Sequence, residues 1–415
     1  MSEREVYLLT GDIGGTNSRM GLYSVRDNNP LVVRYYRNQE HLREKSDGVF
    51  ERNIIAPFLK HCWETNTSLP PLDQVEIISS LAIAGPVRNN QVSMSNLHDI
   101  VIDGTAIANQ VHVKNEPYLS KIKVCKIIND FVAQGYGCLT LKPDEVKELN
   151  PGSHAKVDPK GPKVCVGAGT GLGECYLTPD AEGTYTCFPS EGGHVEWAPR
   201  DELEFKLWRY LRDKFGYQFR VSIERVVSGR GLANCYEFLT QEFPDRVDKK
   251  MHAEFEQAGD MQGKVVSDQA HAVPGSLGEQ ALQIMCGAYG SEVGSAAVKF
   301  IPTGGLYVTG GLTPKNMRFI EGQDSPFLKA YHDKGRVNQV LEHVPLFAVL
   351  VEDLGVRGAL KSAQIEYQKY YFGGTTTTSE TKKRDSDLPW LPLAAATMAG
   401  IAIGMMTKRR GSRFH

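Results

Sequence analysis

Two glycine-rich turns constrain this chain more than any other feature, because each joins an apolar strand to a second strand that runs back. The first turn covers residues 11–16 and lies between predicted strands at 7–10 and 19–23. The second turn covers residues 167–173 and follows an apolar run at 163–166. The same strand–turn–strand unit therefore occurs twice, which indicates a weak internal duplication that is visible only at the turns.

Helical patterns alternate with buried strands along the rest of the chain. Apolar residues recur at helical spacing in 48–64, 203–214 and 278–300, whereas 76–84 and 124–128 are continuously apolar. Strands that alternate with helices are typical of α/β architecture. Two turn units in such a chain predict two α/β lobes with a ligand-binding cleft between them.

Charge and cysteine content exclude several classes of protein. The 415 residues carry a formal net charge of -2, so we expect no nucleic-acid partner, which would need a basic surface. None of the eight cysteines forms a C-x-x-C pair. We therefore expect buried thiols in a reducing compartment and no zinc site.

The first turn has the composition of a phosphate site. Successive backbone amides around Gly14 and Gly15 can form an anion nest, and Thr16 and Asn17 add donors for phosphate oxygens. Asp12 is acidic where an anion would bind, which predicts a Mg²⁺ ion between them, held through water. The alternative is a tight hairpin with a solvated aspartate, and the turn alone leaves it open.

The second turn follows the same logic, with Gly169, Thr170 and Gly171 at its tip. It does not match G-x-G-x-x-G, because Leu172 and Glu174 occupy required glycine positions, and it opens into a strand instead of a helix. The chain also has no G-x-x-x-x-G-K-[ST] motif. Two phosphate-type hairpins without either motif point to the actin-like ATPase fold that sugar kinases share.

At this point the chain resembles a known family, the bacterial-type glucokinases. The resemblance implies a two-lobed α/β fold of the actin-like, hexokinase type and transfer of the γ-phosphoryl of ATP to the 6-hydroxyl of glucose, at the entry to glycolysis. It covers nearly all of the chain except the tail. The matching segments occur in the family's order, at residues 11–19, 81–87, 94–96, 128–131, 167–173, 190–194, 224–229 and 307–311.

The resemblance also implies roles for single residues. Asp130 is the expected catalytic base; a free aspartate, with a pKa near ~3.9, is already ionised at neutral pH. A helix cap at the end of a strand is the alternative for Asp130. Gly310 and Gly311 belong to the adenosine motif. The residues implied to bind glucose are Asn96, Asn129, Asp130, Glu191, His194 and Glu224.

Lobe boundaries and substrate choice follow from the same resemblance. We expect a smaller lobe at 1–139 that is completed by 354–371, and a larger lobe at 140–353. Residues 87–90 read Val-Arg-Asn-Asn where these kinases usually have a Gly-Asp turn, which leaves selectivity among hexoses open. The alternatives are a kinase for mannose or an amino sugar, or a non-catalytic sugar sensor on the same fold. A homodimer is a further partner prediction.

The C-terminal region has its own pattern, which the resemblance does not reach. Residues 373–387 are polar and threonine-rich and are expected to form a disordered linker. The segment Leu388–Met406 carries no charge and is followed by Lys408, Arg409 and Arg410. We interpret it as a short tail-anchor helix that inserts into the mitochondrial outer membrane and leaves the kinase in the cytoplasm. The endoplasmic reticulum, the peroxisome and a fully cytosolic protein are the alternatives.

Overall fold

The computed structural model describes residues 4–94, 97, 100–150 and 155–373. Contacts between residues divide the chain into one unit at Met1–Phe372 and a second at Gly373–His415. Apart from Gly373, the predicted linker and tail helix lie outside the described residues. Within the described ranges, no helix is long and apolar enough to cross a membrane.

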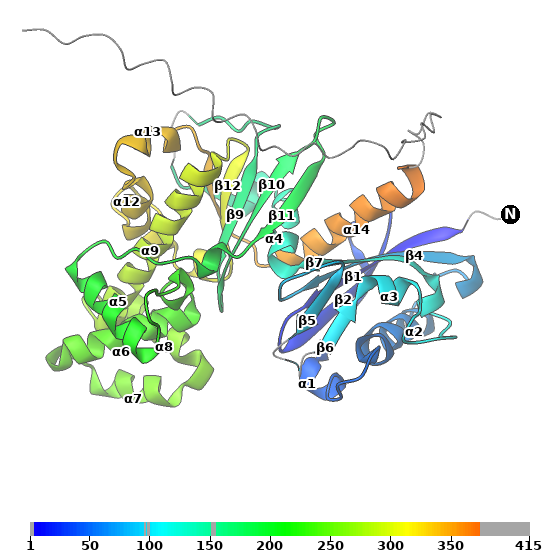
Figure 1. The fold of residues 1–415 in the computed structure, drawn as a ribbon, viewed down its shortest axis with the longest axis horizontal. Coiled ribbons are helices and arrows are strands. Elements are labelled where there is room, and N and C mark those ends of the chain that lie inside the picture. Colours follow the sequence, from blue (N-terminus) through cyan, green and yellow to red (C-terminus); the bar gives the residue numbers. More distant parts are fainter. Residues whose placement is uncertain (1–3, 95–96, 98–99, 151–154, 374–415) are drawn as a thin grey trace, which may run out of the picture. The chain divides into compact units, whose positions relative to one another are not determined.

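A five-stranded sheet lies in the first lobe, in the order β3-β2-β1-β4-β7 (Figure 1). β1 pairs with β2 in antiparallel fashion and with β4 in parallel, and β4 pairs in parallel with β7, which is an edge strand. The strands are β1 (Glu5–Ile13), β2 (Asn17–Ser24), β3 (Pro30–Arg37), β4 (Val75–Ile83) and β7 (Ile122–Asn129).

Helices cover both faces of this sheet because successive strand residues point to opposite sides. Leu9 and Ile77 belong to the cluster that also holds Phe58 of α2 (Ala56–Thr65). Their neighbours Leu8 and Ile78 pack with Leu360 of α14 (Leu354–Phe372). A short hairpin and a helix complete the lobe: β5 (Gln91–Met94), β6 (Ile100–Asp103) and α3 (Gly104–Ala108).

The second lobe is built on a six-stranded sheet in the order β11-β10-β9-β12-β13-β8. Its strands are β8 (Val146–Glu148), β9 (Lys163–Ala168), β10 (Leu172–Pro179), β11 (Tyr185–Ser190), β12 (Gly305–Thr309) and β13 (Leu346–Val349). The long helix α9 (Leu277–Phe300) packs on one face through the largest hydrophobic core. On the other face lies α4 (Asp130–Cys138).

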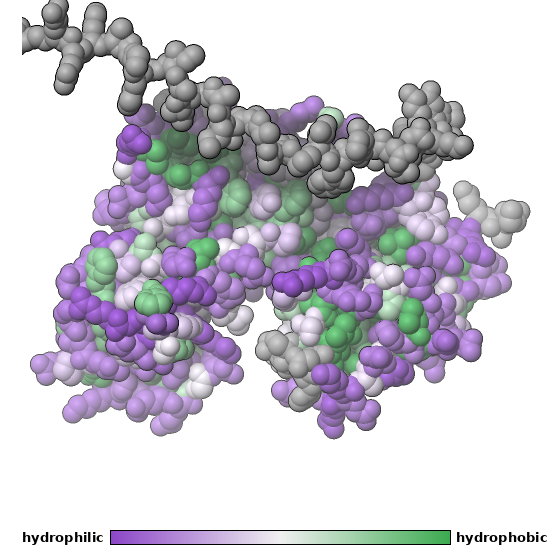
Figure 2. Space-filling view, in the orientation of Figure 1, coloured by the Kyte–Doolittle hydropathy of each residue, from purple (hydrophilic) through white to green (hydrophobic). Residues whose placement is uncertain are grey.

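The remaining helices surround α9 or lie in connections. Figure 2 shows mainly hydrophilic residues on the outer surface of α5 to α8, as expected for amphipathic helices that turn one face to the core. The helices that surround α9 or lie in connections are α1 (Asn38–His41), α5 (Glu202–Lys214), α6 (Gly229–Glu242), α7 (Lys249–Gln257), α8 (Gln262–Ala272), α10 (Leu312–Lys315), α11 (Met317–Ile320), α12 (Pro326–His332) and α13 (Asn338–Leu341).

The predicted elements are confirmed to within a few residues, with one correction at the turns. The helix expected at 48–64 contains a π-helical turn at Glu51–Ile55 before α2. Both turns are shorter than expected. Gly11, Asp12 and Ile13 continue β1 and pair with β2, and the second turn is reduced to 169–171 because 167–168 end β9 and 172–173 begin β10. All eight cysteines are buried and free, as expected. The lobe boundaries at 139/140 and 353/354 stay a prediction.

Candidate active site

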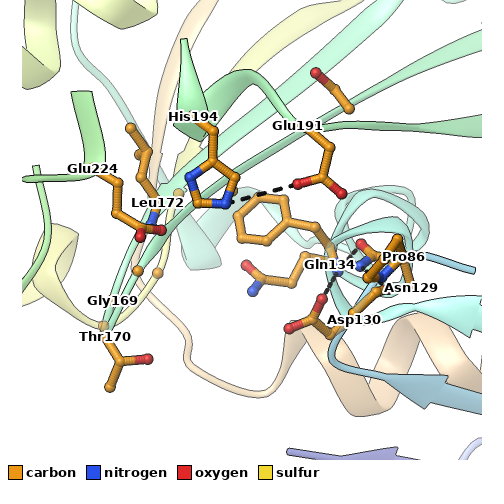
Figure 3. Close-up of a pocket in the computed structure, with 18 residues that line it drawn as sticks. Pro86, Asn129, Asp130, Gln134, Gly169, Thr170, Leu172, Glu191, His194 and Glu224 are labelled. Atoms are coloured by element: carbon orange, nitrogen blue, oxygen red, sulfur yellow. Dashed lines mark hydrogen bonds and ion pairs between the residues drawn. The ribbon is translucent and has the colours of Figure 1, made fainter. Parts of the chain in front are cut away.

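A cavity of about 440 Å³ brings together segments that are far apart in the sequence (Figure 3). Its volume lies within the usual range for small-molecule sites, roughly 300–1,000 Å³. Of the residues predicted from the sequence, ten line it: Asn129, Asp130, Gly169, Thr170, Gly171, Glu191, His194, Glu224, Gly310 and Gly311. Both large sheets of the fold therefore have residues beside one cavity.

Asp130 lies where β7 ends and α4 begins. The cap of this helix is Asn129, whose Oδ1 accepts hydrogen bonds from the backbone amides of Phe131 at 2.8 Å and Val132 at 3.3 Å. The alternative interpretation, in which Asp130 itself caps the helix, is therefore wrong by one residue, because the cap is Asn129. Asp130 accepts a 3.0 Å bond from the Phe131 amide and lines the cavity as the first residue of α4.

The environment of Asp130 changes its acidity. The pKa of Asp130 is raised to about 6: burial is the main cause, the negative charge of Asp12 contributes, and the hydrogen bond from the amide of Phe131 opposes the rise. The expectation of an ordinary pKa near 3.9 is therefore corrected by the tertiary structure. A carboxylate with a pKa of about 6 is largely ionised at neutral pH and is a stronger proton acceptor than a free aspartate.

The glycines of the second turn have separate functions. A Cβ on Gly173 would lie 2.1 Å from the ring of Phe131, and one on Gly167 would lie 2.8 Å from it, so these two glycines make room for α4. Nothing lies within 4 Å of a Cβ built on Gly169. The tip is closed by a 2.8 Å bond from the amide of Gly169 to the carbonyl of Gly171. Only the tip thus remains as a surface for an anion.

Glu224 connects this turn with the other wall of the cavity. Its Oε2 accepts a 2.9 Å hydrogen bond from the backbone amide of Leu172, directly after the turn. A Cβ on Gly171 would lie 2.6 Å from the same oxygen. Glu224 lies in a single 3₁₀ turn, Ile223–Arg225, that precedes α6. The predicted sugar-binding glutamate therefore also holds the predicted phosphate turn.

Glu191 and His194 come from the loop that follows β11. A 3₁₀ turn at Gly192–His194 places them on one side, with 3.9 Å between His194 Nε2 and Glu191 Oε2. Two glycines let this loop lie close to β10: a Cβ on Gly193 would be 1.9 Å from the carbonyl oxygen of Leu172. Both side chains are largely exposed and line the cavity (Figure 3).

The first turn contributes less directly. Gly14, Gly15, Thr16 and Asn17 are not among the residues that line the cavity. Asp12 lies close enough to Asp130 to raise its pKa, and burial raises the pKa of Asp12 itself while Arg19 lowers it. Asn96 lies outside the described residues.

Gly310 lies at the end of β12 in the left-handed region, with φ of 82°. A Cβ there would lie 2.3 Å from the carbonyl oxygen of Ala168. This glycine is therefore required by the backbone conformation and by its close approach to β9.

Sequence reasoning missed part of the lining. Gln134 lies one helical turn after Asp130, and its Oε1 accepts a 3.1 Å bond from Thr309 Oγ1. The i, i+4 spacing on α4 is the signal that could have found it. Gly85, Pro86, Phe131, Leu172 and Ser190 also line the cavity.

The fold and the site together define a class of protein. Two α/β lobes, with a carboxylate at a helix start and glycine-rich turns on the cavity walls, form the actin-like ATPase fold of the hexokinase type. The chain belongs to the glucokinase family, because the family model "Glucokinase" matches residues 9–365.

Curated relatives agree with this placement. A glucokinase from Synechocystis sp. is 35% identical over 370 residues, which cover 86% of this chain and 98% of the relative. A glucokinase from Nostoc sp. is 37% identical over 85% of this chain and 97% of the relative, and one from Helicobacter pylori is 30% identical over 86% and 96%.

Solved structures show the same fold at lower identity. A glucokinase from an Antarctic psychrotroph has a TM-score of 0.64 at 23% identity and covers 86% of this chain and 99% of its own. A glucokinase from Balamuthia mandrillaris, solved in complex with glucose, has a TM-score of 0.66 at 19% identity and covers 88% and 95%.

Proposed function

We propose that this chain is a glucokinase that transfers the γ-phosphoryl of ATP to the 6-hydroxyl of glucose and releases glucose 6-phosphate and ADP. The observation that carries the proposal is the position of Asp130 in one cavity with Glu191, His194 and Glu224. Membership of the glucokinase family supports the same reaction.

Asp130 is the proposed base. Its carboxylate would accept the proton of the 6-hydroxyl as that oxygen bonds to the γ-phosphorus and the bond to the ADP oxygen breaks. The cap made by Asn129 fixes the start of α4, so the carboxylate is held at the cavity wall. Burial, which raises its pKa to about 6, brings the group closer to the working pH of such a base.

Glu191, His194 and Glu224 are the proposed partners of the sugar hydroxyls, together with Asn96. Hydroxyls both donate and accept, and carboxylates and imidazole match them. Asn129 is a special case among the predicted sugar residues. Its Oδ1 caps α4 and its Nδ2 donates a 3.0 Å bond to the carbonyl of Gly85, so a sugar contact would use the second Nδ2 hydrogen.

The nucleotide is proposed to lie against the glycine-rich turns. Gly169, Thr170, Gly171, Gly310 and Gly311 line the cavity, and the space around Gly169 is open. The turn at 14–17, which does not line this cavity, would be the second phosphate contact.

Mg²⁺ fits the donor set on one condition. Asp12 supplies a carboxylate oxygen, but the described residues hold no group of three acidic, histidine or cysteine side chains around one point. An ion there would take most of its ligands from phosphate oxygens and water, as Mg²⁺ commonly does, and would neutralise phosphate charge.

A coupled assay of ADP release over a panel of sugars tests the reaction. We expect glucose-dependent release that requires Mg²⁺, with glucose preferred over mannose and glucosamine in kcat/KM. Preference for another hexose would support the alternative kinase, and no sugar-dependent release, combined with measurable glucose binding by calorimetry, would support a sensor.

We propose separately that Leu388–Met406 is a tail anchor with a mitochondrial address, on a linker at 373–387. The support is the sequence alone: an uncharged stretch followed by Lys408, Arg409 and Arg410. A reporter fused to 373–415 should resist extraction from membranes with alkaline carbonate; a reporter that washes off contradicts the anchor, and one embedded in the endoplasmic reticulum contradicts only the address.

Sedimentation of the purified protein checks the proposed homodimer.

A further inference from the structure

The unusual Asn-Asn pair at 89–90 forms the tip of a tight hairpin that precedes β5. The amide of Arg88 donates to the carbonyl of Gln91, and the amide of Gln91 donates to the carbonyl of Arg88, both at 2.9 Å. Asn89 and Asn90 lie between them with φ of 51° and 61°. Positive φ at both central residues is the signature of a type I′ turn, in which asparagine is one of the few tolerated side chains.

The side chain of Asn90 binds the free edge of β7. Its Oδ1 accepts a 2.7 Å hydrogen bond from the amide of Ile127, and its Nδ2 donates a 2.9 Å bond to the carbonyl of Cys125. A strand that paired in parallel with β7 would bond to the same two groups, a carbonyl and an amide two residues apart. The amide group of Asn90 thus occupies the place of a strand beside β7, which is the edge of the sheet.

The surrounding backbone is shaped to this contact. The carbonyl of Asn90 accepts a 3.0 Å bond from the amide of Gly104. A Cβ on Gly104 would lie 2.2 Å from the carbonyl oxygen of Cys125 and 2.5 Å from Nδ2 of Asn90, so only glycine fits there. The turn at 88–91, the start of α3 and the edge of β7 are therefore joined at Asn90.

The same strand also holds the other end of the segment. Asn129, the last residue of β7, donates from Nδ2 to the carbonyl of Gly85 at 3.0 Å. Gly85 and Pro86 line the cavity beside Asp130, which follows Asn129 directly. Segment 85–90 is thus fastened at both ends to the strand that delivers the proposed base.

We propose that Asn90 is a positioning residue for the sugar. It holds segment 85–90 against β7 and so fixes the positions of Gly85 and Pro86 relative to Asp130. The inference rests on the proposed function, because it assumes that the sugar hydroxyl is brought to Asp130. Asn90 does not line the cavity itself and acts only through Gly85 and Pro86. Loss of its bonds to β7 frees the segment at one end and misplaces the sugar.

The chemistry of the contact selects informative substitutions. Asn90→Gly keeps the positive φ without strain and removes both side-chain bonds to β7, together with a 3.4 Å bond from Nδ2 to Thr105 Oγ1. Asn90→Asp keeps an acceptor for the Ile127 amide but cannot donate to the Cys125 carbonyl. Asn89→Gly is the matched control, because Asn89 shares the turn and the positive φ, and its side chain is exposed.

The experiment measures kcat, the glucose KM and the ATP KM for the four proteins. For Asn90→Gly we expect the glucose KM to rise about tenfold or more while the ATP KM stays within about twofold, because the sugar loses its alignment. Asn90→Asp should lie between this variant and the wild type, and Asn89→Gly should match the wild type.

The outcomes separate the inference from the proposed function. A wild type that releases no ADP with glucose contradicts the proposed function. An active wild type, with Asn90→Gly raising both KM values equally or neither, contradicts the role of Asn90. If Asn90→Gly is unfolded by circular dichroism, the split between the two KM values in Asn90→Asp decides the question.

Discussion

Arg357 of α14 holds Glu145 through two parallel hydrogen bonds, from Nη1 to Oε2 at 2.7 Å and from Nη2 to Oε1 at 2.8 Å. Glu145 lies in the connection between α4 and β8, and α14 packs against α4 and the first sheet. Two segments that are 212 residues apart are thereby joined where the chain passes from one predicted lobe to the other. The guanidinium lowers the pKa of Glu145 to about 2.

This ion pair should stabilise the fold in a pH-dependent way. Because the pKa of Glu145 falls from 4.5 to about 2 on folding, its contribution is complete above about pH 4.5 and is lost as the pH falls to about 2. A double-mutant cycle with Glu145→Gln and Arg357→Ala should give a coupling of about 1 kcal/mol at pH 7, as is usual for a partly exposed pair. Urea unfolding measures it, and an equal coupling at pH 3 would contradict the assignment.

Replacing the proposed base tests the chemical step. Asp130→Asn keeps the shape of the side chain and removes its basicity, so kcat should fall by about 10²–10⁴ with glucose binding largely retained. In the wild type, kcat should rise with pH through about 6, where the Asp130 carboxylate forms. Rate profiles between pH 5 and 8 check both. Near-normal turnover in the purified, folded variant would rule out Asp130 as the base.

Two substitutions of Glu224 should separate its bond to the Leu172 amide from its proposed contact with the sugar. Glu224→Ala removes the acceptor of the Leu172 amide, so the turn loosens and both the glucose KM and the ATP KM should rise. Glu224→Gln retains an acceptor oxygen for that amide, and we expect mainly the glucose KM to rise, by about tenfold. Steady-state kinetics with each substrate varied provide the measurement. Equal effects of Gln and Ala on the ATP KM would show that the turn does not depend on this bond.

A buried pair of acids, Glu174 and Glu292, should lower stability in alkaline solution. Glu174 lies directly against Gly192, in the loop that follows β11. Burial and the negative charge of Glu292 together raise the pKa of Glu174 to about 8. Glu292 itself pairs with Lys299 at 3.4 Å. The folded state therefore binds more protons than the unfolded state between about pH 4.5 and 8, and stability falls as the pH rises through this range.

The Glu174→Gln variant tests this sign, because its side chain does not ionise. Its midpoint of thermal unfolding should change less between pH 6 and pH 9 than that of the wild type. Glu254→Gln, an exposed position on α7, is the control and should follow the wild type. A parallel decline in wild type and Glu174→Gln would show that other groups cause it.

Local pattern was enough for the elements and for much of the site. Residue spacing predicted α5, α9 and the strands on either side of both turns. Apolar residues recur at helical spacing where one face of a helix is buried, and they form a continuous run where a whole strand is buried. The order of motifs along the chain also predicted ten of the residues that line the cavity. Gln134 was missed because its only signal, the i, i+4 spacing from Asp130, becomes informative once α4 is known to begin at Asp130.

The sequence by itself determined the α/β class, the two turn units and the type of chemistry, because period, glycine clusters and acidic positions are local properties. Only the tertiary structure decided which glycines serve packing, as Gly167 and Gly173 do for Phe131, and which leave a surface for a ligand. It also decided the acidity of Asp130 and the contact of Asn90 with β7. Burial and hydrogen bonds across 37 residues of sequence are properties of the packed chain, and no local pattern encodes them.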